Sequence, residues 1–200
     1  MISGDLHAAV RRVIYQPEEI AGAVRRLARE IAADHRGRPL VLLGVLKGAL
    51  YLTVDLGRAL ARLPDGPSEI FIDYVCVTSY GMGSTSSGNV RLLLDAELPL
   101  ADRDVVIVED LADEGLTLRY LQTFLESRAP HRLRTCVLFD KPARRKVAVP
   151  LDYVGLPAPD AFVVGYGLDY QEIYRNLPYL AELTPEALGG GRTPPHGASK

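Results

Sequence analysis

The sequence predicts an α/β protein built on a doubly wound, mostly parallel sheet. Short runs of consecutive apolar residues alternate along the chain with segments of helical periodicity, the pattern of a parallel sheet covered by helices on both faces. The apolar runs span residues 40–46, 70–77, 105–108 and 133–139. Three of them are followed directly by charged or glycine residues, and ligands of such sheets bind at the carboxyl ends of the strands.

Apolar residues spaced three or four apart mark the helices. Three segments show this spacing: Ile20, Val24, Leu27 and Ile31; Leu52, Leu56 and Leu60; and Leu118, Leu121 and Leu125. The first helix begins at Pro17, and Glu18 and Glu19 occupy its first turn, where acids interact favourably with the helix dipole. Residues 90–94 predict a strand returning from a polar loop, and residues 152–165 predict two short strands separated by prolines.

The composition indicates one globular domain, which we expect over residues 1–187, followed by a disordered tail over 188–200. The formal net charge of −2 argues against general binding of nucleic acid or anionic membranes. No apolar run approaches the roughly 18 residues of a membrane span, and the start lacks the layout of a signal peptide. We therefore expect a cytoplasmic protein in which Cys76 and Cys136 are buried free thiols.

Residues 105–121 are the most informative stretch. A strand ends in Glu109 and Asp110, then Asp113, Gly115 and Thr117 precede a helix. A helix N-terminus behind a tight loop is a ready phosphate site, because its free N–H groups and dipole favour an anion. Carboxylates beside an anion site suit a magnesium ion or a ribose diol between them.

This stretch has two other interpretations. The acid-terminated strand resembles the metal-holding strand of a P-loop ATPase, but residues 44–48 lack the spacing of the loop it requires. An ordinary βα turn with solvated acids is the other.

Residues 78–88 are small and polar, and their glycines precede a strand, so they predict a lid rather than a dinucleotide site.

Lys47 with Gly48, the 109–117 loop, and Lys141 each follow a buried strand and so should meet at one sheet edge. The motifs are GVLKGA (44–49), TSYG (78–81), VVIVEDLADEGLTL (105–118), FDKPARRK (139–146) and FVVGYGLDYQEIYRNLPY (162–179). With these motifs the chain resembles a bacterial hypoxanthine-guanine phosphoribosyltransferase, a branch of the type I phosphoribosyltransferases. The strand with two acids is typical of the whole family, and the Lys-Pro and FVVGYGLDY segments of the 6-oxopurine branch.

The resemblance implies a type I phosphoribosyltransferase fold with a small hood formed by the chain ends and a flexible lid loop. It implies purine salvage: transfer of the 5-phosphoribosyl group from phosphoribosyl diphosphate to N9 of a 6-oxopurine. Hypoxanthine or guanine would give IMP or GMP plus diphosphate, and xanthine stays open as a third base. Magnesium would be the cofactor, and the protein would be a homodimer or homotetramer.

The resemblance also implies a role for each motif residue. Asp113 would exchange a proton with the purine N7, the general acid-base role. Gly115, Leu116 and Thr117 would hold the 5′-phosphate, and Glu109 and Asp110 would bind the ribose hydroxyls and their magnesium. Lys141 would donate to the purine O6, Phe162 would stack on the base, and Val163 would contact its edge through the backbone. Asp169 would hold a second magnesium, Arg175, Lys47 and Gly48 would bind diphosphate, and Ser79 and Tyr80 would close the lid.

Glu114 departs from the family pattern, which has Thr or Ser after the catalytic Asp, at a position that contributes to substrate binding. An acid there would weaken phosphate binding unless its carboxylate turns outward, which is the expected orientation. The departure leaves a second function open, a non-catalytic nucleotide- or RNA-binding regulator on the same fold. We expect Arg144, Arg145 and Lys146 to form a solvated face, and an unusual, strained peptide between Leu46 and Lys47.

Overall fold

The computed structural model describes residues 9–80 and 89–189, and its centre is a six-stranded sheet. The strand order is β4 (Asn89–Leu94), β3 (Glu69–Tyr80), β2 (Pro39–Leu46), β5 (Asp104–Ala112), β6 (Arg132–Asp140) and β7 (Tyr153–Pro157). All neighbours are parallel except β3 and β4, which run antiparallel. The predicted doubly wound, mostly parallel sheet is therefore confirmed.

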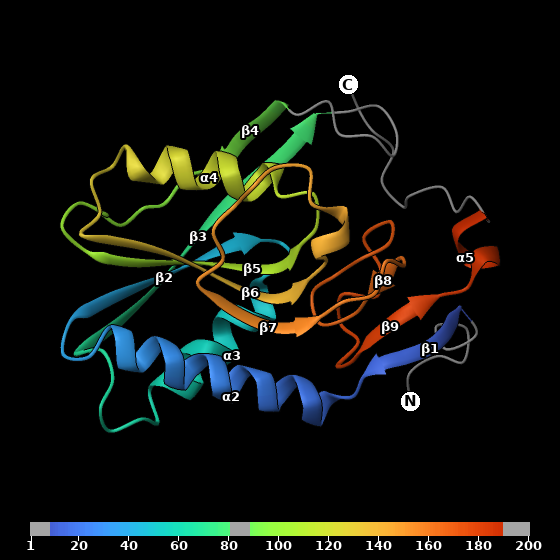
Figure 1. The fold of residues 1–200 in the computed structure, drawn as a ribbon, viewed down its shortest axis with the longest axis horizontal. Coiled ribbons are helices and arrows are strands. Elements are labelled where there is room, and N and C mark those ends of the chain that lie inside the picture. Colours follow the sequence, from blue (N-terminus) through green and yellow to red (C-terminus); the bar gives the residue numbers. More distant parts are fainter. Residues whose placement is uncertain (1–8, 81–88, 190–200) are drawn as a thin grey trace.

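Helices cover both faces of this sheet (Figure 1). α2 (Pro17–Asp34) and α3 (Leu50–Leu60) lie on one face, and α4 (Leu116–Glu126) lies on the other. Side chains alternate along β5 accordingly: Val106 and Val108 pack in the core under α2 and α3, whereas Val105 and Ile107 pack under α4. Burial on both faces explains why this strand is a continuous apolar run.

A second, smaller sheet joins the two ends of the chain. Its order is β1 (Val10–Tyr15), β9 (Leu180–Leu183) and β8 (Val163–Val164), all antiparallel. The buried Glu182 carboxylate lies 2.8 Å from Arg11 Nη1 and 2.8 Å from Arg12 Nε, which ties β1 to β9. This sheet is the hood that the family resemblance implies.

The final helix corrects one expectation. α5 (Pro185–Gly189) includes Leu188 and Gly189, so a tail beginning at 188 is wrong for these two residues. Residues 190–200 lie outside the described part of the chain, as do residues 1–8 and 81–88. Cys136 is a buried free thiol as predicted, but Cys76 is only half-buried. Among the described residues, no helix is long and apolar enough to cross a membrane.

Charged side chains at the amino ends of the strands form a network around a buried carboxylate. Asp104 is fully buried and accepts from His35 Nδ1 at 2.8 Å and from His131 Nδ1 at 2.7 Å. Arg38 Nε lies 3.3 Å from the same carboxylate.

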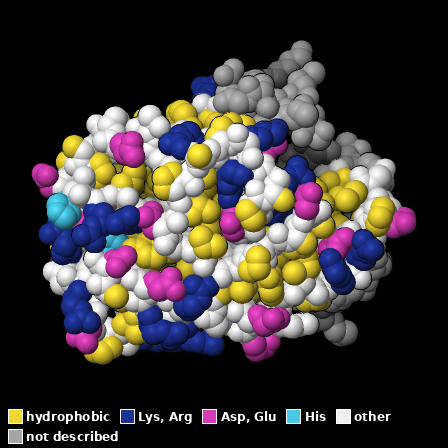
Figure 2. Space-filling model, in the orientation of Figure 1, with side chains coloured by type: hydrophobic (Ala, Val, Ile, Leu, Met, Phe, Trp, Pro, Cys, Tyr) yellow, Lys and Arg dark blue, Asp and Glu magenta, His cyan; other side chains and the backbone are white. Residues whose placement is uncertain are grey.

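Figure 2 shows basic and acidic side chains mixed over the face in view, in agreement with the small net charge.

Candidate active site

The carboxyl ends of β2, β5 and β6 bring the predicted residues to one edge of the sheet. Glu109 and Asp110, near the end of β5, are only 8% and 9% exposed. Burial, followed by the charge of Asp110, raises the pKa of Glu109 well above its usual range. Burial also raises the pKa of Asp110. Two adjacent buried carboxylates favour a bound cation or hydroxyl donors.

Close backbone packing seats Asp110 against the loop after β2. A Cβ on Gly48 would lie 1.8 Å from Asp110 Oδ2, and one on Gly167 would lie 1.9 Å from the Gly48 carbonyl oxygen. Only glycine permits both approaches. The unusual peptide expected between Leu46 and Lys47 is a cis peptide bond.

The loop before β9 adds cationic groups to this edge. Arg175 Nη2 lies 2.7 Å from Asp169 Oδ1, and Arg175 Nη1 donates to the Gly167 carbonyl at 2.8 Å. The buried Arg175 Nε has no hydrogen-bond acceptor among the described residues. Lys47 Nζ lies 2.7 Å from Glu172 Oε2, and this contact lowers the pKa of Glu172. Glu172 was not among the residues predicted from the sequence, although it lies three residues after Asp169.

The 113–117 segment, which we call the phosphate loop, ends at an open helix N-terminus. Gly115 is the N-cap of α4, with a φ of 87° and no side-chain cap. The first N–H groups of a helix have no partner within the helix, and the half-buried Thr117 side chain lies in this first turn. A phosphate group would satisfy these donors.

Asp113 sits on this loop with one unsatisfied oxygen. Arg144 Nε forms an ion pair with Asp113 Oδ1 at 3.0 Å, but this buried oxygen accepts no hydrogen bond from the described part of the chain. Arg145 Nη1 donates to the Asp113 carbonyl at 2.6 Å, and Arg145 also pairs with Asp140. The buried oxygen is available to accept a proton or a hydrogen bond from a ligand.

The basic residues after β6 form a solvated face only in part: the side chains of Arg144 and Lys146 are 45% and 54% exposed, whereas that of Arg145 is 16% exposed. Arg144 and Arg145 both contact Asp113, and Lys146 Nζ lies 2.5 Å from Glu114 Oε1. The Glu114 side chain is 22% exposed. Its carboxylate faces the half-exposed Lys146 and is itself largely shielded from solvent.

Lys141 and Phe162 border the space in front of Asp113. Lys141 is 4% exposed, its Nζ donates to the Ala161 carbonyl at 2.7 Å, and burial lowers its pKa against the opposing effect of Asp113. Phe162 is 44% exposed and makes an edge-to-face contact with Tyr170 at 5.3 Å between centroids, so it is not a core residue. Val163 is buried in β8.

The structure does not test the predicted lid. Ser79 and Tyr80 end β3, where their backbones pair with Val90 and Asn89. Their side chains and residues 81–88 lie outside what the structure describes.

Within the described ranges, no three His, Cys, Asp or Glu side chains gather in a metal-binding cluster.

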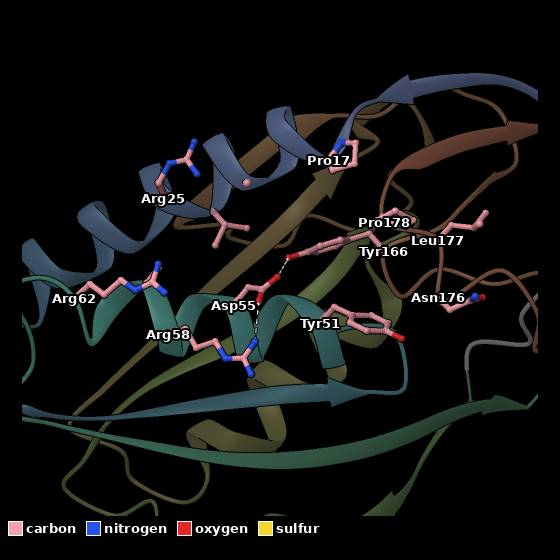
Figure 3. Close-up of a pocket in the computed structure, with 13 residues that line it drawn as sticks. Pro17, Arg25, Tyr51, Asp55, Arg58, Arg62, Tyr166, Asn176, Leu177 and Pro178 are labelled. Atoms are coloured by element: carbon pink, nitrogen blue, oxygen red, sulfur yellow. Dashed lines mark hydrogen bonds and ion pairs between the residues drawn. The ribbon is translucent and has the colours of Figure 1, made fainter. Parts of the chain in front are cut away.

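A hollow of about 520 Å³ is lined by residues of α2, α3 and the segment 166–178 (Figure 3). Tyr166 donates to Asp55 there at 2.7 Å, and Arg58 Nη1 lies 3.8 Å from the same carboxylate. None of the predicted site residues lines this hollow. The candidate active site is therefore the strand edge, not this pocket.

Comparison with known proteins agrees with this geometry. The family model described as the phosphoribosyl transferase domain matches residues 12–171. The hypoxanthine-guanine phosphoribosyltransferase of Staphylococcus aureus (strain Mu50) is 38% identical over 90% of this chain and 98% of its own length. A bifunctional protein TilS/HprT of Listeria innocua is 42% identical over 90% of this chain, which spans only 27% of that relative.

A solved structure gives the same result in three dimensions. A Trypanosoma cruzi hypoxanthine phosphoribosyl transferase matches with a TM-score of 0.83 and 41% identity, over 90% of this chain and 94% of that one. That structure concerns the role of its C-terminal region in oligomeric state and enzymatic activity. By its family model, its full-length relative and its fold, the chain belongs to the phosphoribosyltransferase family, in the hypoxanthine-guanine phosphoribosyltransferase branch.

Proposed function

We propose that this chain transfers the 5-phosphoribosyl group of phosphoribosyl diphosphate to N9 of hypoxanthine or guanine, giving IMP or GMP and diphosphate. The observation that supports this most directly is the buried Asp113 Oδ1, which lacks a hydrogen bond and belongs to the same loop as the open N-terminus of α4. An acid that can accept a proton thus lies beside an anion site, as phosphoribosyl transfer to a base requires.

The phosphoribosyl group occupies the edge between the phosphate loop and Gly48. Backbone N–H groups of Gly115, Leu116 and Thr117, with the Thr117 hydroxyl, bind the 5′-phosphate. Glu109 and Asp110 face the ribose hydroxyls. Lys47, Gly48 and Arg175 bind the diphosphate, and the guanidinium of Arg175 suits the paired oxygens of a phosphate.

The purine lies between Phe162 and the phosphate loop. Lys141 donates to O6, whereas the amino group of adenine at this position would place a donor against a donor, so adenine is rejected. Val163 contacts the base edge through its backbone. As N9 bonds to C1′ and the bond from C1′ to diphosphate breaks, Asp113 accepts the N7 proton, which limits the positive charge on the base.

Magnesium fits the carboxylates of this edge. Mg²⁺ binds oxygen ligands and is commonly held by one or two carboxylates together with phosphate oxygens of the substrate. Glu109 and Asp110 supply two buried carboxylates for one ion. Asp169, whose carboxylate lies beside Arg175, would hold a second. When bound, the metal neutralises the charge of the leaving diphosphate.

The remaining proposals concern the whole protein. Residues 1–187 form one phosphoribosyltransferase domain, and Ser79 and Tyr80 close the lid over the sugar. The protein forms a homodimer or homotetramer, and the exposed side chains of Leu50 and Tyr51 at the start of α3 offer apolar surface for a second copy. The free thiols of Cys76 and Cys136 suit the reducing cytoplasm.

The test is an assay with phosphoribosyl diphosphate, magnesium and each purine base in turn. We expect IMP from hypoxanthine and GMP from guanine, no AMP from adenine, and no product after chelation of magnesium. Binding of nucleotide or RNA without any turnover would instead establish the non-catalytic regulator.

A further inference from the structure

Residues 144–147 clasp the phosphate loop from a segment some thirty residues further along the chain. Five contacts join the two segments. The side-chain contacts are Arg144 Nε to Asp113 Oδ1 at 3.0 Å, Arg145 Nη1 to the Asp113 carbonyl at 2.6 Å, and Lys146 Nζ to Glu114 Oε1 at 2.5 Å. The N–H groups of Lys146 and Val147 both donate to the Glu114 carbonyl, at 2.9 and 3.4 Å. Val147 also packs closely against the loop: a Cβ added to Gly115 would lie only 3.1 Å from the Val147 carbonyl oxygen.

The clasp matters because of the charge on Glu114. This carboxylate is one residue before Gly115, the N-cap that opens the anion site of α4. With its side chain 22% exposed, solvent screens it only in part. An unneutralised carboxylate here would repel a phosphate at the helix N-terminus, whereas the ammonium of Lys146 at 2.5 Å cancels its charge.

We propose that Lys146 is a positioning residue for the phosphoribosyl substrate and that it acts through Glu114. Lys146 neutralises the Glu114 carboxylate and holds it away from the helix N-terminus, so the phosphate loop accepts a dianionic group although it carries an acid. The effect belongs to substrate binding and leaves the proton transfer at Asp113 unchanged. This inference rests on the proposed placement of the 5′-phosphate at residues 115–117.

The test compares Lys146→Met in two backgrounds. In the natural background we expect the KM for phosphoribosyl diphosphate to rise roughly two- to fivefold, the scale of one partly exposed ion pair, with a larger rise at low than at high salt. The kcat and the KM for the purine should change less than about twofold, because the interaction is uniform binding of one substrate. In a Glu114→Gln background the same substitution should be silent, and Lys146→Arg should restore the natural KM.

Arg36→Met is the matched control. It removes one positive charge and an exposed ion pair with Asp65, 4.0 Å long, at the amino ends of the strands and away from the site. We expect no change in its kinetics. All variants are compared by thermal unfolding midpoint, so a loss of folded protein is distinguished from a loss of binding.

Three results would overturn the inference. An equal rise in KM in the natural and the Glu114→Gln backgrounds would mean that Lys146 contacts the substrate directly. An unchanged KM for phosphoribosyl diphosphate would mean that the carboxylate needs no partner, and a fall in kcat alone would place Lys146 in the chemistry. Thr117→Val tests the underlying site separately: if its KM for phosphoribosyl diphosphate is normal, the placement of the phosphate itself is wrong.

Discussion

Gly48→Ala is the sharpest test of how the site is assembled. The added methyl group would lie 1.8 Å from Asp110 Oδ2 and 2.5 Å from Asp110 Cγ. Ordinary contact is about 3.5 Å, so the carboxylate or the loop must move by well over 1 Å. Asp110 is 9% exposed and its Oδ1 accepts from the Leu111 N–H at 2.7 Å, which leaves it little room to turn away.

A misplacement of about 1 Å in a catalytic site costs on the order of 10²-fold in rate. We therefore expect Gly48→Ala to lower kcat/KM for phosphoribosyl diphosphate by about 10²-fold. Overpacking of this kind costs about 1–3 kcal/mol of folding free energy, so the protein should remain folded. Steady-state kinetics and thermal unfolding measure the two effects.

Gly66→Ala is the matched control, because its added Cβ would meet Ala32 Cβ at 3.7 Å, an ordinary contact. Its kinetics and unfolding midpoint should stay close to those of the natural protein. Natural kinetics in Gly48→Ala would show that Asp110 and the 46–48 loop need not pack closely for turnover, which would refute the geometric argument.

Three further predictions concern single side chains. Asp113→Asn should lower kcat by roughly 10²–10⁴-fold with a smaller effect on KM, the range for a lost general acid-base; near-normal turnover would remove Asp113 from the mechanism. Lys141→Ala should impair hypoxanthine and guanine, and efficient use of adenine by the natural protein would contradict the donor role of Lys141. Burial lowers the pKa of His35, which lies beside Asp104. The unfolded chain therefore binds a proton at His35 more readily than the folded protein does. The contribution of neutral His35 to stability is complete above the ordinary pKa near 6.5 and is lost as the pH falls below that value. The free energy of unfolding should therefore fall less between pH 7.5 and pH 5.5 in His35→Gln than in the natural protein, by at most about 1.4 kcal/mol per pH unit; equal slopes in urea unfolding would exclude His35 as the titrating group.

The sequence predicted the strands that are buried on both faces and the short strand β8 within residues 152–165, but it missed β1 and β9 of the hood. Residues 105–108 form a continuous apolar run because every side chain meets a helix layer. β1 has no such run: it includes Arg11 and Arg12, which are held by Glu182 about 170 residues away. A strand stabilised by a distant partner carries little local signal. β5 also extends beyond its predicted end at residue 108. Leu111 still pairs with Phe139 of β6, although Glu109 and Asp110 interrupt the apolar run.

The sequence supplied candidate site residues where the chemistry depends on residue type, but not the contacts between residues that are distant in the chain. The motifs identified Asp113, Lys141 and Arg175 because each has a recognisable neighbourhood in sequence. Arg145 and Lys146 were assigned to a solvated face because basic residues in a row are usually solvated. Their contacts with Asp113 and Glu114 cross some thirty residues and arise only when β5 and β6 pair.

Three cations of the site share one arrangement, in which each is paired with an acid of the chain itself. Lys47 pairs with Glu172, Arg175 with Asp169, and Lys146 with Glu114. In the proposed function, Lys47 and Arg175 then bind the diphosphate, so substrate binding replaces an internal ion pair by an external one. The gain in free energy is smaller than for an unpaired cation, but the side chains are already ordered and less entropy is lost. Lys146 differs because its partner borders the phosphate, so keeping the internal pair is what favours the ligand.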